Sequence, residues 1–180
     1  MQGRRVVLGP VLVAYLAAAL AYALLTPLWQ APDEPAHFNY VRHLVEESRL
    51  PILQPGDYPG ERLDELRAAH WPDGEDVSDI LYEGHQPPLY YLLATPILGV
   101  VRGESLALQV WALRLFTVAL GAVAVFLTHR LGLLLWPGRH GQATALAAFT
   151  AFLPMHTAIA GAVNNDVLAE ALLIATVIVL

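Results

Sequence analysis

Long apolar blocks and one long polar segment alternate along this chain. The first block, residues 6–28, is an uncharged run of 23 residues, and blocks of similar length follow at residues 107–128 and 141–163. A fourth apolar run occupies residues 167–180. About 20 apolar residues in a helix cross a hydrocarbon core of roughly 30 Å. The pattern therefore predicts an all-α integral membrane protein with spans in these four regions, the last one continuing onward.

The first block has a second interpretation as a signal peptide, because Ala21-Tyr22-Ala23 resembles a small-residue cleavage site. We favour a span, since the run is longer than the roughly 7 to 15 residues of a signal-peptide core and continues past that site. Arg4 and Arg5 precede the run and favour a cytoplasmic N-terminus. Residues 30–106 then lie on the outer face of the cell membrane.

The apolar run at residues 87–101 is too short for a spanning helix, and it contains Pro96. We expect an interfacial or re-entrant helix there. Arg130 and Arg139 then fall in a cytoplasmic loop, as the positive-inside bias favours. The alternative topology makes residues 87–101 a true span and places both arginines outside.

The polar segment, residues 30–106, is strongly acidic. It holds fourteen acidic residues and five arginines, a formal charge of −9, whereas the remainder of the chain carries +3. This balance is opposite to what nucleic-acid binding requires, so we exclude that partner. The chain has no cysteine, which excludes disulfides and thiolate chemistry.

Two short helices are predicted within the polar segment. One begins near Pro35, which fits a first helical turn, with Glu34 as a possible N-cap. Its apolar face is formed by Tyr40, Val41, Leu44 and Val45. Residues 61–69 predict the other helix, with Leu63 and Leu66 facing inward.

Candidate chemistry gathers where the polar segment meets the predicted membrane. Asp33 and Glu34 follow the first span, and His85-Gln86-Pro87-Pro88 precedes the short apolar run. Two polar and proline-containing elements at one face can line one pocket. The simpler interpretation of the acidic pair is helix capping and neutralisation of the helix dipole.

Arg114 is a charged residue within an apolar block, a costly position that usually faces a pocket or a partner. One interpretation is a structural ion pair with Glu170, which also lies in an apolar run. The other is an anion site for a lipid phosphate, which suits the planar fork of donors on arginine.

The seven histidines raise the question of a metal site. His37 and His43 are six residues apart, so they do not share a helix face as a zinc-binding pair would. A metal held through His37, His70 or His85 stays an alternative to surface or interfacial histidines. We assign no metal ligand and no certain cofactor, and leave a divalent cation open.

Three elements follow one another along the chain: Asp-Glu with a nearby His-Phe, then His-x-Pro-Pro-Leu, then an arginine in the next span. This ordered set resembles the GT-C superfamily of membrane glycosyltransferases. Within it, the protein O-mannosyltransferases and the lipid-A aminoarabinose transferases are the most similar. The resemblance covers essentially all 180 residues as the N-terminal part of a longer, polytopic GT-C-like helical bundle. We expect this part to be inactive alone.

The resemblance implies a role for each matching residue. Asp33 corresponds to the catalytic base and Glu34 to its acidic neighbour. Residues implied in donor binding are His37, His85, Pro87, Pro88, Tyr90, Arg114 and Asp166. An extra residue between Glu34 and His37, and Gln86 within the His-Pro-Pro element, depart from the family pattern. Tyr90 and Tyr91 replace a Gly-Lys of the mannosyltransferases, which puts a protein acceptor in doubt.

The implied activity is hexosyl or pentosyl transfer from a polyprenyl-phosphate sugar to a hydroxyl on a glycan, lipid or protein at the cell envelope. The donor is a co-substrate, and membrane lipids are the other partners. The alternative is a non-catalytic polytopic membrane protein, either a transporter fragment or a scaffold, in which an intramembrane Arg114 and Glu170 would be equally at home.

Overall fold

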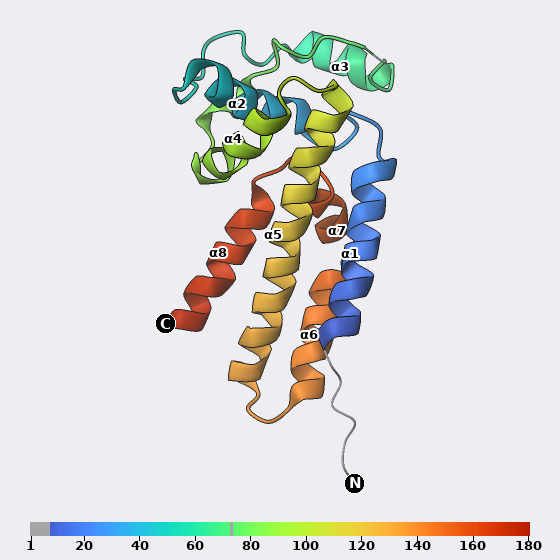
Figure 1. Ribbon diagram of the computed structural model, residues 1–180, viewed down its shortest axis with the longest axis vertical. Coiled ribbons are helices and arrows are strands. Elements are labelled where there is room, and N and C mark those ends of the chain that lie inside the picture. The colour runs from blue at the N-terminus through green and yellow to red at the C-terminus, as the bar shows by residue number, and fades with distance from the viewer. Residues whose placement is uncertain (1–7, 73) are drawn as a thin grey trace.

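The computed structural model describes residues 8–72 and 74–180, and in these ranges the regular structure is helical throughout. Figure 1 shows the long helix α5 along the middle of the molecule, with α2, α3 and α4 gathered around its upper end. The elements are α1 (Leu8–Leu25), α2 (Glu34–Glu47), α3 (Gly60–Ala68), the short 3-10 helix η1 (Tyr82–His85), α4 (Leu89–Val101), α5 (Leu106–Leu135), α6 (His140–Ala151), α7 (Pro154–Ala160) and α8 (Asp166–Val179).

Two helices, α1 and α5, are long and apolar enough to cross a membrane, and the bent pair α6 and α7 makes a third if it counts as one span. The fold is thus an all-helical one with two or three candidate membrane-spanning elements. The short helix α4 has 13 residues and lies within the run predicted as a helix at residues 87–101, and α8 has 14. Which face of a membrane each end meets stays a prediction.

Helix α5 is longer than the predicted span at residues 107–128. Ser105 begins it by accepting a hydrogen bond from the backbone N–H of Leu108 at 3.4 Å. Arg130, expected in a cytoplasmic loop, lies inside the helix, because the apolar sequence continues through Leu135. With 30 residues, α5 is about 45 Å long, more than a hydrocarbon core requires.

The predicted span at residues 141–163 is a broken helix. Helices α6 and α7 meet at an angle of 64°, and Pro154 begins α7. Proline has no backbone N–H and disfavours a helical conformation of the preceding residue, so the break falls just before it. The Thr157 hydroxyl donates to the carbonyl oxygen of Ala151 at 2.9 Å, which satisfies a carbonyl at the end of α6.

Both helices predicted in the polar segment are present. On α2 the side chains of Tyr40, Val41 and Leu44 are buried, and on α3 those of Leu63 and Leu66 are buried. The predicted N-cap of α2 was wrong. Asp33 occupies that position, while Glu34 is the first helical residue and is fully buried.

Small residues allow α1 to pack closely against its neighbours. Ala19 and Ala23 of α1 are fully buried, and α1 contacts α5, α6 and α7. Gly161, at the end of α7, lies so close to Tyr22 that an added Cβ would be 2.7 Å from the Tyr22 Cβ. Close backbone approach through small residues is typical of helix packing in membranes.

Candidate functional site

Arg114 and Glu34 form a buried ion pair between α5 and the start of α2. The guanidinium binds the carboxylate through two bonds, Nε to Oε1 at 2.7 Å and Nη2 to Oε2 at 2.6 Å. Both side chains are completely buried. A two-bond arginine–carboxylate contact fixes orientation as well as distance.

The remaining donors of Arg114 bind the C-terminal end of α1. Nη1 donates to the carbonyl oxygens of Ala23 at 2.9 Å and Thr26 at 2.7 Å, and Nη2 donates to that of Pro27 at 3.1 Å. The last carbonyls of a helix lack partners within the helix, and they favour a nearby cation. All five N–H groups of Arg114 are therefore occupied.

The Glu34 carboxylate also accepts two backbone N–H groups, from Trp29 at 3.2 Å and from Val163 at 3.1 Å. The ion pair and its hydrogen bonds thus join α1, α2, α5 and the segment before α8. We call Arg114, Glu34 and these backbone partners the clamp. It fixes the chain on either side of Asp33.

The clamp corrects three sequence-based interpretations. Glu170 pairs with His156 at 2.9 Å and not with Arg114. Arg114 has no free N–H for a phosphate oxygen in this arrangement, so its predicted donor-binding role does not fit. Glu34 is likewise enclosed, with both carboxylate oxygens bonded, so its predicted catalytic role does not fit either.

The backbone of Asp33 has an uncommon conformation, and its side chain has a specific hydrogen-bond partner. Its φ is 57°, in the left-handed region, which costs residues other than glycine of order 1 to 3 kcal/mol and which asparagine and aspartate tolerate better than the others. Its side chain is partly exposed and makes no capping bond to α2. Instead the Tyr82 hydroxyl donates to Asp33 Oδ1 at 2.7 Å. The capping interpretation therefore does not explain the Asp33 carboxylate.

The predicted His-Gln-Pro-Pro element lies beside Asp33. His85 Nδ1 is 2.9 Å from the carbonyl oxygen of Tyr82, the partner of Asp33. The Asn165 amide donates to Gln86 Oε1 at 3.3 Å, which brings the start of α8 to the same place. The structure therefore joins the two polar elements that the sequence placed at one face.

Glu83 adds a buried acidic group to this region. Burial raises the pKa of Glu83, and the nearby charges of Asp33 and Asp166 act in the same direction. Its Oε2 has no hydrogen-bond partner among the described residues. A carboxyl group in such a place favours its neutral form.

His37 is buried behind Asp33. Its Nδ1 lies 2.8 Å from the Tyr91 hydroxyl, and the Asn164 amide lies 3.4 Å from Nε2. Burial lowers the pKa of His37 to about 4, although the charge of Asp33 opposes this shift. The imidazole is therefore neutral near pH 7 and holds its place through these two contacts.

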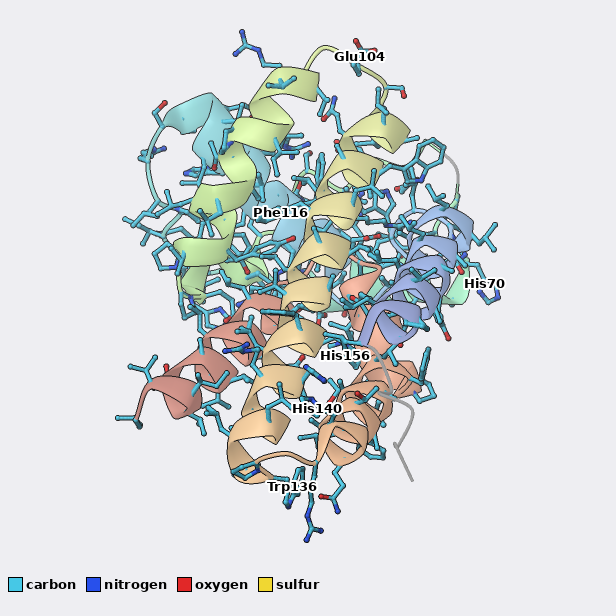
Figure 2. The ribbon with its side chains drawn as sticks, turned by 60° about the horizontal axis from the view of Figure 1, so that its bottom comes forward. His70, Glu104, Phe116, Trp136, His140 and His156 are labelled. Carbon is cyan, nitrogen blue, oxygen red and sulfur yellow. The ribbon has the colours of Figure 1, made fainter. Side chains whose placement is uncertain are left out.

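The other predicted site residues divide by exposure. His85, Pro87, Pro88 and Asp166 are exposed, whereas Tyr90 is buried and 2.7 Å from the Thr117 hydroxyl. A ligand at the surface can contact the four exposed residues without rearrangement of the chain, whereas Tyr90 is enclosed. Among the described residues, no group of three or more His, Asp or Glu side chains is placed to hold a metal ion. Figure 2 shows His70 well apart from His140 and His156.

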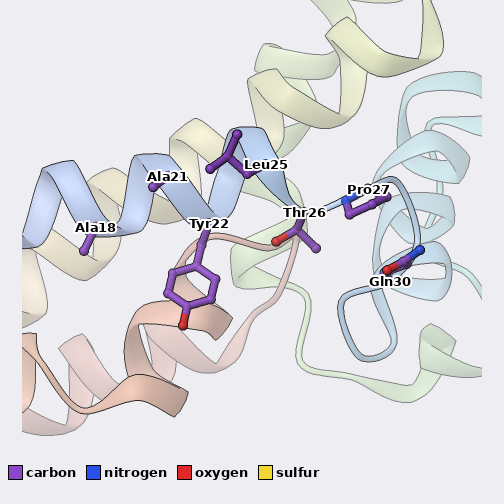
Figure 3. A pocket seen from close by; sticks show the side chains of 7 residues that line it. All are labelled: Ala18, Ala21, Tyr22, Leu25, Thr26, Pro27 and Gln30. Atoms are coloured by element: carbon purple, nitrogen blue, oxygen red, sulfur yellow. The ribbon is translucent and has the colours of Figure 1, made fainter.

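A hollow of about 620 Å³ lies along the exposed face of α1. Figure 3 shows its lining, which runs from Ala18 along the helix to Gln30. Thr26 and Pro27, whose carbonyl oxygens bind Arg114, belong to this lining. The hollow therefore adjoins the clamp.

Sequence reasoning missed Tyr82, Tyr91 and Asn164 as site residues. Tyr82 lies 49 positions from Asp33, and Asn164 lies 127 positions from His37. The available signal was that Tyr82 and Tyr91 lie near His85 in the sequence and that Asn164 lies near Asp166. No family model, no curated protein and no solved structure matches this chain.

Proposed function

We propose that this chain carries the acceptor-activating part of a membrane glycosyltransferase that uses a polyprenyl-phosphate sugar. The observation that supports the proposal most is the Asp33 carboxylate, which is partly exposed, held in a strained conformation and not used as a helix cap. Strained backbone held by its surroundings is found at functional sites. The resemblance described above rests on the same residue.

In the proposed reaction, Asp33 accepts the proton of the acceptor hydroxyl while that oxygen attacks the anomeric carbon. Tyr82 holds Oδ1, which leaves Oδ2 for the hydroxyl. The bond between the anomeric carbon and the phosphate oxygen breaks, with inversion, and polyprenyl phosphate departs. Proton removal by a positioned carboxylate contributes typically 10²- to 10⁴-fold to a rate.

The clamp changes the assignment of the group that meets the departing phosphate. Because Arg114 is fully engaged, we assign this contact to the exposed His85, whose Nδ1 is held by the Tyr82 carbonyl. Its Nε2 is then the ring nitrogen left to contact the phosphate. The apolar hollow along α1 is our candidate location for the polyprenyl chain.

The experiment is a donor-consumption assay on the protein expressed from its complete open reading frame and reconstituted in liposomes. We expect release of polyprenyl phosphate that saturates with donor and depends on an added acceptor. A transporter or a scaffold would leave the donor intact. Failure of every polyprenyl-phosphate sugar tested, in a preparation with native helix content, would contradict the proposal.

The proposal also requires the site to face outward. Single cysteines can be introduced without background, because the chain has none. In intact cells, cysteines at Asp57 and Glu104 should react with an impermeant maleimide, while one at Gly138 should not. Labelling at Gly138 with protection at Glu104 would reverse the proposed orientation.

A further inference from the structure

Two of the five arginines in the acidic segment form no close ion pair among the described residues, although the charge of Arg42 contributes to lowering the pKa of Asp76. Arg49, Arg62 and Arg67 form ion pairs with neighbouring acidic side chains. Arg42 and Arg102 form neither ion pairs nor side-chain hydrogen bonds in the described part of the chain. In a segment with fourteen acidic residues, two unpaired arginines are unexpected.

Both unpaired arginines line the same groove, about 600 Å³ in volume. Arg42 comes from α2, and Arg102 follows the end of α4. The floor includes Phe38 and Leu98, which are almost completely buried. Figure 1 shows α2, α4 and the start of α5 together at one end of the molecule. Ligand sites commonly combine such an apolar floor with a few polar groups.

The groove is held in shape before any ligand binds. The Gln109 side chain donates to the carbonyl oxygens of Arg102 at 3.2 Å and Glu104 at 2.9 Å, which closes the turn between α4 and α5. Figure 2 labels Glu104 in this turn. Phe38, Arg42 and Val45 project from one face of α2 at helical spacing. Preorganisation of this kind reduces the entropy lost on binding.

We propose that this groove binds a phosphate group carried on a polyol, through the guanidinium groups of Arg42 and Arg102. Arginine presents paired N–H donors that match phosphate oxygens. Glu46 also lines the groove, so the ligand carries hydroxyl groups that donate to this carboxylate. Arg42 lies about 13 Å along α2 from Asp33, and Asp33 does not line the groove, so the groove is a second site and does not rest on the proposed reaction.

The test uses the 180-residue chain in a nonionic detergent, titrated calorimetrically with glycerol 1-phosphate and, as the uncharged control, glycerol. We expect saturable binding of the phosphate alone. The double variant Arg42→Gln with Arg102→Gln should bind at least tenfold more weakly. The matched double variant Arg49→Gln with Arg67→Gln removes the same charge from paired arginines and should bind as the wild type does.

A lipid headgroup is the other source of the same chemistry. Native mass spectrometry after reconstitution in phosphatidylcholine with phosphatidylglycerol distinguishes the sources, since a headgroup site retains phosphatidylglycerol and loses it in the Arg42 and Arg102 double variant. The Arg42→Lys with Arg102→Lys variant should keep part of the affinity. Circular dichroism verifies the fold of each variant. Absence of both ligands from the wild type, or equal weakening by both glutamine pairs, would overturn the proposal.

Discussion

Replacing Arg114 with glutamine should destabilise the protein strongly, because the clamp depends on that single guanidinium. The change removes both charge-assisted bonds to Glu34 and leaves the carboxylate with two backbone N–H partners. It also takes the donors away from three carbonyl oxygens at the end of α1. Breaking a buried ion pair by removing one partner typically costs about 3 to 5 kcal/mol.

The assay is reversible unfolding in mixed micelles, followed by circular dichroism as a denaturing detergent is added. A double-mutant cycle with Glu34→Gln should give a coupling energy of about 2 kcal/mol or more, since the two side chains are in direct contact. The matched cycle with Glu170→Gln should give a coupling within about 0.5 kcal/mol, because Glu170 pairs with His156. A loss below about 1 kcal/mol for Arg114→Gln, or equal coupling to Glu170, would refute the reasoning.

Two other predictions concern packing and pH. Gly132→Ala should destabilise by about 1 to 3 kcal/mol in the same assay, because its Cβ would lie 2.8 Å from the Ala143 Cα, while Gly99→Ala, with open space around it, should be neutral or stabilising. His37 has a pKa of about 4 in the folded state and 6.5 as its ordinary value, so the unfolded state gains a proton first and stability falls as pH drops from 6.5 to 4. The His37→Gln variant should lose much of this dependence, worth up to about 3 kcal/mol, and the exposed His140→Gln should keep it; equal slopes would contradict the assignment.

The helices were largely readable from the sequence, whereas the partners of the buried charges were not. Hydrophobic runs predicted α1, most of α5 and the short α4, and the proline at position 154 was a visible signal for the break between α6 and α7. Such signals are local. The observed helix extends beyond its predicted end where apolar sequence continues past a charged residue, as it does after Arg130 in α5.

The site was readable only in part, because its geometry depends on long-range contacts. Asp33 and His85 were identified from their positions beside apolar runs, and they lie close to one residue, Tyr82. The partner of Arg114, Glu34, is 80 positions away in the sequence. The sequence predicted Glu34 as an N-cap of α2, whereas the tertiary packing buries it. The left-handed backbone of Asp33 has no sequence signature, since this conformation is imposed by its surroundings.

The central claim is that the Asp33 carboxylate removes the proton of the acceptor hydroxyl while the clamp holds Asp33 in place. The direct measurement is the turnover of Asp33→Asn in the reconstituted donor-consumption assay, beside the wild type and the matched Asp57→Asn. Asparagine keeps the size of the side chain and tolerates the left-handed backbone, but it cannot accept the proton. We predict a fall of about a hundredfold or more at normal expression and donor affinity, with Asp57→Asn unchanged. Turnover of Asp33→Asn at the wild-type rate would contradict the account.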